Sequence, residues 1–258
     1  MLNLPWFYNK SIRNVVVVFG TLFNEIQVLR TTSEGDPELQ RFTVPLSYSS
    51  KEKWLARLRQ GDQLDGEETV TQMSLPRMGF ELTNVIYDPQ RKHITTTQRK
   101  ACDPNDPNVL LSSFVPVPYD LELSLYIIVD KQDDGLQIVE QILPFFGPEF
   151  TVSIKSVGGL YPSVDVPFIL NSTTIEDNFE GDMTDRRSIL WTLTFTAKAQ
   201  IFANVSSGGI IRKVIANLRE FDGTLDARIC VEPDPLDAAP GDPFEPMVDI
   251  TECGAGGC

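Results

Sequence analysis

"DDGLQIVEQILPFF", residues 133–146, is the most strongly patterned stretch of the chain. At about 100° per residue on a helix, its polar residues Gln137, Glu140 and Gln141 fall on one narrow arc, and its apolar residues fill the opposite half. Two aspartates stand at the N-terminal end, where carboxylates interact favourably with the helix dipole, and a proline follows where the helix should end. The pattern predicts an amphipathic helix with half of its surface buried.

The segments on both sides of this helix carry the alternating or β-branched composition of strands. We predict strands at residues 26–32, 39–48, 78–88, 119–129, 150–157, 164–175 and 188–203. The first two flank the turn-rich "SEGDPE", which indicates a hairpin. The expected fold class is therefore α+β: a mixed, mostly antiparallel β-sheet flanked by a few amphipathic helices and connected by long loops.

Four further segments complete the expected fold. Residues 11–23 contain four valines, which favour a strand, but the length and Ser11 as a cap favour a helix, and we predict a helix. Residues 49–61 form a short amphipathic helix, residues 89–108 a long polar loop or arm, and residues 210–220 a last strand or arm.

The end of the chain differs in composition from the rest. From residue 230 onward there are seven acidic residues, five prolines and no Lys or Arg. Such a segment buries too little apolar surface to order itself. We predict a single ring-forming α+β domain over residues 1–229 and a disordered, acidic, Pro/Gly-rich tail over residues 230–258; that this domain forms a ring is implied only by the resemblance described below.

Composition excludes several functional classes. The 258 residues include 22 Lys and Arg against 36 Asp and Glu, a net charge of -14. This charge opposes binding to phosphate backbones and to anionic membranes. No apolar run reaches the roughly 18 residues of a membrane span, so we expect a soluble protein that is not exported and binds neither membranes nor specific nucleic acid.

No pattern in the sequence indicates catalysis. His93 is the only histidine, and the phosphate-loop, dinucleotide, zinc-protease and serine-hydrolase motifs are missing. Adjacent carboxylates occur at 67–68, 133–134 and 176–177, in a turn, at a helix start and at a strand end. These settings disfavour the rival interpretation of a carboxylate-pair hydrolase or a Mg²⁺ site. We predict no catalytic residue, no metal and no cofactor.

The cysteines are Cys102, Cys230, Cys253 and Cys258, and none is in a CxxC pair. We interpret them as free thiols; the alternative is a disulfide or metal site at Cys253 and Cys258.

Basic residues stand out in two places in this acidic chain. Arg91, Lys92, Arg99 and Lys100 gather in the predicted polar loop. Residues Arg186–Arg187 enter the strand at 188–203 together, where they are either solvated charges or partners for acidic groups on a neighbouring copy, since a guanidinium makes bidentate pairs.

Five blocks, taken together, carry a family resemblance. They are "FYNKSIRNVVVVFGTLFNEIQVLR", "VPLSYSSKEKWLARL", "LPRMGFEL", "DDGLQIVEQILPFFGPEF" and "RRSILWTLTF". In order and spacing they resemble the tail sheath stabiliser, or tail completion, family of T4-like contractile-tailed bacteriophages. The resemblance covers roughly residues 6 to 205, with "QIVEQILPFF" its most specific part, and it thins at residues 91–112 and after about residue 208.

The resemblance implies a homohexameric ring at the head-proximal end of the tail. The ring would cap and stabilise sheath and tube, contact the tail terminator ring, the tail sheath protein and the head neck proteins, and let genomic DNA pass through its lumen. It would perform no reaction, and it would reside in the tail-neck region of the virion after assembly in the host cytoplasm. Another tail component, such as the tail terminator or a baseplate wedge protein, is the alternative.

The resemblance also suggests roles for the residues singled out above. Leu136, Val139, Leu143 and Phe146 should face the protein's own sheet, so that the polar arc of Gln137, Glu140 and Gln141 points outward to a partner. The basic cluster should face acidic sheath or neck surfaces. An acidic lumen wall should keep the path of the DNA non-adhesive.

Overall fold

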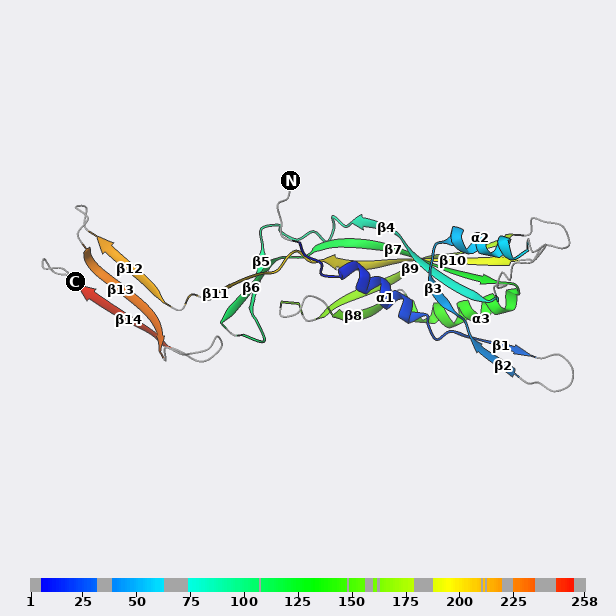
Figure 1. The fold of residues 1–258 in the computed structure, drawn as a ribbon, viewed down its shortest axis with the longest axis horizontal. Coiled ribbons are helices and arrows are strands. Elements are labelled where there is room, and N and C mark those ends of the chain that lie inside the picture. The colour runs from blue at the N-terminus through cyan, green and yellow to red at the C-terminus, as the bar shows by residue number, and fades with distance from the viewer. Residues whose placement is uncertain are drawn as a thin grey trace. The chain divides into compact units, whose positions relative to one another are not determined.

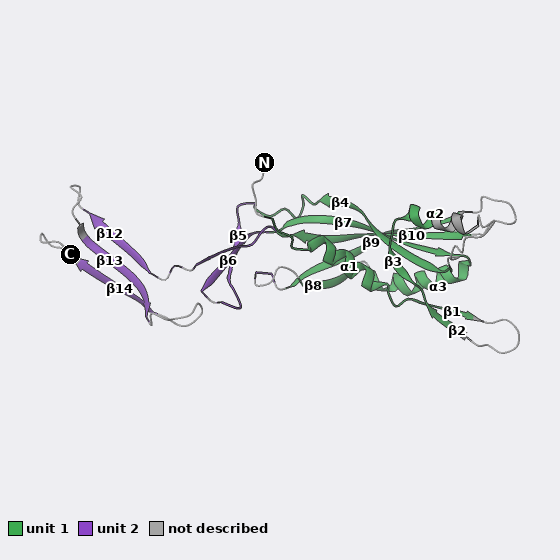
Figure 2. Cartoon of the chain, in the orientation of Figure 1, with its two compact units in different colours: residues 1–94, 116–156, 163–202 green, residues 95–115, 157–162, 203–258 purple. Residues whose placement is uncertain are grey.

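The computed structural model divides the chain into two compact units (Figure 2). Unit 1 comprises residues 1–94, 116–156 and 163–202, and unit 2 comprises residues 95–115, 157–162 and 203–258. The residues described are 6–31, 39–62, 74–106, 108–147, 149–155, 160–161, 163–178, 188–209, 211, 213–219, 225–234 and 245–252. The expected domain limit after residue 229 does not separate these units, since it falls inside strand β13 (Leu225–Asp234); how the chain divides into folding domains stays a prediction.

Unit 1 is built on one mixed sheet of six strands in the order β3-β4-β7-β10-β9-β8. Only β3 and β4 pair in parallel, and the other neighbours are antiparallel. This confirms the α+β class and the mostly antiparallel sheet. The strands are β3 (Leu46–Tyr48), β4 (Arg77–Tyr87), β7 (Val117–Val129), β8 (Glu149–Lys155), β9 (Ser163–Asn178) and β10 (Ser188–Ile201).

Helices cover both faces of this sheet (Figure 1). Alternate residues of β7 point to opposite faces. Leu123, Leu125 and Ile127 join the large core cluster with α1 (Ser11–Leu22) and α3 (Gln132–Ile142), whereas Tyr126 and Ile128 join a small cluster with Trp54 of α2 (Lys51–Asp62). Both faces of β7 are thus buried over residues 125–129, which explains the continuous apolar sequence there, whereas the first half of the strand alternates between apolar and polar residues.

The helix predicted at the start of the chain is confirmed as α1. Phe19 is completely buried and packs its ring against Phe23, Phe80, Phe168 and Phe195. This packing on the sheet outweighs the strand preference of the valines, because tertiary burial overrides weak intrinsic propensity. The expected serine cap is not formed, since Lys10 is the cap residue and its backbone is left-handed with φ 57°.

The predicted hairpin is also confirmed. β1 (Gln27–Thr31) pairs antiparallel with β2 (Leu39–Thr43) in a two-stranded sheet of its own. α3 begins and ends close to its expected limits, and a single 3-10 turn, η1 (Leu143–Phe145), follows it.

Unit 2 contains two three-stranded sheets. One has the order β11-β6-β5 and the other the order β12-β13-β14. Their strands are β5 (Gln98–Cys102), β6 (Val109–Phe114), β11 (Ser206–Gly209), β12 (Val214–Arg219), β13 (Leu225–Asp234) and β14 (Glu245–Glu252).

Two stretches of unit 2 differ from the sequence prediction. β5 forms inside the expected loop of residues 89–108. Residues 230–234 and 245–252 are paired strands, where a flexible acidic tail was expected. The pairing holds these strands by backbone hydrogen bonds, and Lys213 adds an ion pair to Glu232; neither contact is visible in composition. The rest of the expected tail lies outside the described residues.

Candidate interaction surfaces

Two glutamines of α3 form hydrogen bonds with the backbone of β1 at its outer edge, the edge that faces away from β2, as a neighbouring strand would. The Gln137 side chain accepts a hydrogen bond from the Leu29 N–H (2.9 Å) and donates one to the Leu29 carbonyl (3.1 Å). The Gln141 side chain does the same at Gln27, donating to its carbonyl at 2.7 Å and accepting from its N–H at 3.4 Å. Four residues of helix rise about 6 Å and two residues of strand about 6.7 Å, so the two spacings match.

A charged contact fixes the same hairpin beside the glutamines. Arg30 donates from Nε to Asp134 Oδ2 at 3.2 Å, with a further contact from Nη2, and it reaches Asp130 at 3.3 Å. Asp134 is only 2% exposed, and the hydrogen bond that it accepts raises the pKa of Arg30. The Arg30 guanidinium also lies 5.1 Å from the ring centre of Phe42 in β2. We call Gln137, Gln141, Arg30 and Asp134 the hairpin clamp.

The clamp corrects the expected orientation of α3. Val139 is buried and Phe146 half-buried, as predicted, but Leu136 and Leu143 are 48% and 42% exposed. Ile138 and Ile142 are buried in their place. Relative to the prediction, the helix is rotated about its own axis, because Gly135 lies against the Trp191 ring, where an added Cβ would stand 2.6 Å from Nε1. The amides of the polar arc thus serve the protein's own hairpin; that they also bind a partner stays a prediction.

Next to the clamp lies an open apolar groove of about 640 Å³. The groove runs between the end of α1 and the end of α3. Phe145 is 65% exposed there, while Phe23 and Ile142 are buried at its base. Glu140, one of the predicted interface residues, contributes a carboxylate. The lining residues are Leu22, Phe23, Glu25, Ile26, Glu140, Gln141, Ile142, Pro144, Phe145, Phe146 and Phe150.

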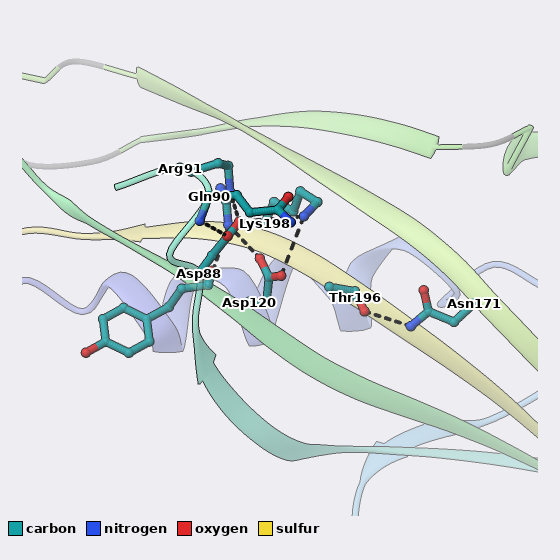
Figure 3. A network of polar contacts seen from close by, with 8 residues as sticks. Asp88, Gln90, Arg91, Asp120, Asn171, Thr196 and Lys198 are labelled. Atoms are coloured by element: carbon teal, nitrogen blue, oxygen red, sulfur yellow. Dashed lines mark hydrogen bonds and ion pairs between the residues drawn. The ribbon is translucent and has the colours of Figure 1, made fainter. Parts of the chain in front are cut away.

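Arg91 of the predicted basic cluster is engaged inside the protein (Figure 3). Its Nε donates to Asp88 Oδ2 at 2.6 Å and its Nη2 to Asp120 Oδ1 at 2.5 Å. Lys198 on β10 lies 3.5 Å from Asp120 and 3.9 Å from Asp88. Asp88 is 8% exposed, and the hydrogen bond from Arg91 lowers its pKa. The network ties the chain after β4 to β7 and β10, so Arg91 has a structural role.

The other predicted basic residues differ in their settings. Lys92 is exposed in unit 1, and Lys100 is exposed on β5 of unit 2. The Arg99 guanidinium lies 4.7 Å from the ring centre of Tyr161, also in unit 2. The cluster therefore divides between the units. Arg186–Arg187 lie outside the described residues.

Sequence reasoning missed the acidic partners in these contacts, which are Asp130 and Asp134 for Arg30 and Asp88 and Asp120 for Arg91. Asp134 was assigned to the helix dipole, and Asp88 was not considered. A signal existed for each arginine: Arg30 lies within an apolar strand and Arg91 just after one, where a half-buried charge needs a partner. Asp120, Asp130 and Asp134 are distant in sequence from their arginines, so these pairs could not be assigned before the fold was known, whereas Asp88 is only three residues before Arg91.

The remaining chemical candidates have ordinary surroundings. His93 is exposed, Cys102 and Cys230 are free thiols, and Glu176 pairs with Lys51 at 2.8 Å. Cys253 and Cys258 and the carboxylates at 67–68 lie outside the described part. No group of three or more His, Cys, Asp or Glu residues that suits a metal occurs among the described residues. In the same part of the chain, every helix is too short or too polar to cross a membrane.

Comparison with known proteins identifies the family. The sequence pattern of the T4-like virus Myoviridae tail sheath stabiliser matches residues 6–249, a range that contains the clamp, the groove and the Arg91 network. Tail completion protein gp15 of Enterobacteria phage T4 is 32% identical over 212 residues, which cover 80% of this chain and 76% of the phage T4 protein. The chain therefore belongs to the tail sheath stabiliser family of T4-like bacteriophages.

Proposed function

We propose that the chain forms a hexameric ring at the head-proximal end of a contractile phage tail. The ring caps and stabilises the sheath and tube and joins the tail to the neck of the head. The observation that carries the proposal is the family match over residues 6–249, nearly the whole chain. Its partners are then further copies of itself, the tail terminator ring, the sheath protein and the neck proteins. The match favours this role over that of the terminator or a baseplate wedge protein.

The exposed apolar surface of unit 1 supports an assembling role. A ring subunit buries surface once on folding and again at the contacts with its neighbours. Besides the groove, the C-terminal half of β4 carries exposed apolar side chains: Val85, Ile86 and Tyr87 are 42%, 43% and 39% exposed. β3 pairs only with Met78–Phe80, so within the described sheets this half of β4 has a strand on one side only. Such an edge can accept a strand from a partner.

The exposed basic residues and the net charge suggest how the ring meets its surroundings. Acidic sheath or neck surfaces are proposed to contact Lys92, Arg99 and Lys100. Arg91 is not part of this set, because it forms ion pairs inside the protein. Arg186–Arg187 and Glu140 are proposed contacts between copies. A net charge of -14 per chain makes a lumen that repels DNA phosphates, so DNA crosses it without binding.

The ring is placed in the tail-neck region of the virion, after assembly in the host cytoplasm. No catalytic residue, metal, cofactor or membrane contact belongs to the proposal. The chain acts by occupying a position and by binding its neighbours.

Light scattering on a sizing column, combined with electron microscopy of the main peak, tests the ring. The expected result is a species near six times the 28.9 kDa mass of the chain, with ring-shaped particles. The protein should also attach to the head-proximal end of purified tails that lack it, and DNA should not bind the ring at low salt. A monomer that does not attach to such tails would overturn the proposal.

A further inference from the structure

The apolar groove beside α3 is too exposed to be explained by folding alone. Phe145 is 65% exposed, and the half-buried Phe146 and Phe150 line the groove with it. The volume of about 640 Å³ falls in the range of roughly 300–1,000 Å³ of pockets that bury a drug-sized ligand, so the groove has room for a large aromatic side chain. Exposed apolar surface bounded by polar residues marks an interaction site.

A second exposed aromatic feature lies at the start of the chain. Trp6, Phe7 and Tyr8 are consecutive and are 89%, 40% and 57% exposed. Aromatic side chains, tryptophan above all, carry much of the energy of protein interfaces when they enter a pocket. We call residues 6–10, "WFYNK", the aromatic segment.

The aromatic segment and the groove lie at opposite ends of α1. The segment precedes Ser11, and the side chain of Asn9 holds it by donating to the Phe202 carbonyl at 3.0 Å. The groove is built on Leu22 and the residues that follow. The 12 residues of the helix span about 18 Å, so the segment of one chain does not occupy its own groove.

Charge favours a neighbouring copy as the occupant. The groove presents the carboxylates of Glu25 and Glu140, and no Lys or Arg is among the described residues that line it. The aromatic segment ends in Lys10, and Arg13 follows one turn later; both are exposed. Neither glutamate makes an ion pair with a described residue.

We propose that the aromatic segment of one copy inserts Trp6 into the groove of the next copy, with Lys10 beside Glu25 and Glu140. The two surfaces differ, so the contact is head-to-tail, the kind that closes into a ring when the rotation between subunits allows it. This inference rests on the proposed ring and names the contact that joins its subunits.

Cross-linking between two single variants tests the contact directly. Chains carrying Phe7→Cys are mixed with chains carrying Phe145→Cys under oxidising conditions, and a larger tag on one partner marks the mixed dimer. The matched control replaces the second variant with Tyr48→Cys, which is 58% exposed and lies outside the groove. We expect the mixed dimer when Phe7→Cys is paired with Phe145→Cys and not when it is paired with Tyr48→Cys. Each single variant, oxidised by itself, reports any background from the native cysteines.

Assembly and fluorescence provide a second measurement on the same protein. Trp6→Ala should raise the concentration for half-assembly about tenfold or more. Glu140→Lys should weaken assembly, and adding Lys10→Glu should restore it. Trp54 and Trp191 are 3% and 5% exposed, so acrylamide quenching reports mainly Trp6 and should fall on assembly.

The outcomes separate this contact from the proposed ring. A ring that forms unchanged with Trp6→Ala and yields no specific cross-link overturns the contact and leaves the ring. A specific cross-link in a protein that never reaches the hexamer mass supports the contact and overturns the stoichiometry. If the protein shows neither assembly nor a cross-link at high concentration, the contact is overturned.

Discussion

Replacing Gln137 and Gln141 by alanine removes every hydrogen bond that α3 makes to the outer edge of β1. Three of these bonds are between 2.7 and 3.1 Å long, and the fourth, at 3.4 Å, is weak. A hydrogen bond of this kind contributes about 0.5–1.5 kcal/mol net, and these are exposed to water, so the lower half of that range applies. The two glutamine side chains should therefore stabilise the attachment of β1 by about 1.5–3 kcal/mol.

Hydrogen exchange of individual backbone amides measures this stabilisation. The Leu29 and Gln27 amides donate to the glutamines, so their exchange should accelerate by about 10- to 150-fold in the double variant. Val28, directly between them in β1, points its amide to the other edge, where the strand pairs with β2, and should keep most of its protection.

Gln132→Ala, an exposed position at the start of the same helix, is the control and should leave all three amides unchanged. Equal exchange of the Leu29 amide in the double variant and the wild type would refute the assignment of the glutamines to the hairpin. Acceleration of Val28 to the same degree would show that the glutamines hold the whole hairpin together and not only its attachment.

Three further perturbations test other parts of unit 1. Gly135→Ala should lower the free energy of unfolding by about 1–2 kcal/mol in urea titrations, because its Cβ would stand 2.6 Å from Nε1 of the buried Trp191 ring. The pKa of Asp88 is lowered in the folded state, so the stability that its carboxylate contributes is present above the unfolded pKa of about 3.9. This stability is lost as pH falls through the folded pKa. Asp88→Asn should therefore show a shallower loss of stability below about pH 4 than the wild type. Burial, aided by the hydrogen bond to Glu81, raises the pKa of Tyr126 to about 12, so ultraviolet titration should find Tyr126 still protonated at about pH 11. The stability that this tyrosine contributes is present below its unfolded pKa of about 10 and is lost as pH rises toward 12.

Each of these has a result that would contradict it. Gly147→Ala meets no atom within 4 Å and serves as the control for the glycine variant; equal effects at the two positions would remove the steric explanation. If the stability of wild type and of Asp88→Asn falls in parallel at acid pH, the ion pair between Asp88 and Arg91 does not persist in solution. Tyr126→Phe should abolish the late titration step, and a step that survives in this variant belongs to another tyrosine.

The elements of unit 1 were largely predictable because local pattern and burial agree there. The alternation in β7, the turn signals between β1 and β2 and the 3.6-residue period of α3 each have a local cause. α1 was ambiguous, since its valines favour a strand, and it is a helix because Phe19 fills the centre of an aromatic cluster that comes from other elements.

The candidate surfaces were less predictable, because their partners come from distant parts of the chain. The period of α3 identified the arc of Gln137, Glu140 and Gln141, but no local signal shows that the backbone of β1 would lie against it. Arg91 looked like surface charge until the fold brought Asp120 to it. In unit 2, β13 and β14 are held by pairing between segments whose acidic and proline-rich composition is typical of flexible chain.

The clamp also fixes which way the β1–β2 hairpin projects. A slip of one residue would point the amides that the glutamines bind toward β2, and a slip of two would separate Arg30 from Asp134. Only one alignment satisfies both conditions, so every copy of the chain that forms the clamp holds its hairpin in the same register against α3. In a closed assembly of identical subunits, that uniformity would let a row of hairpins meet a symmetric partner all at once.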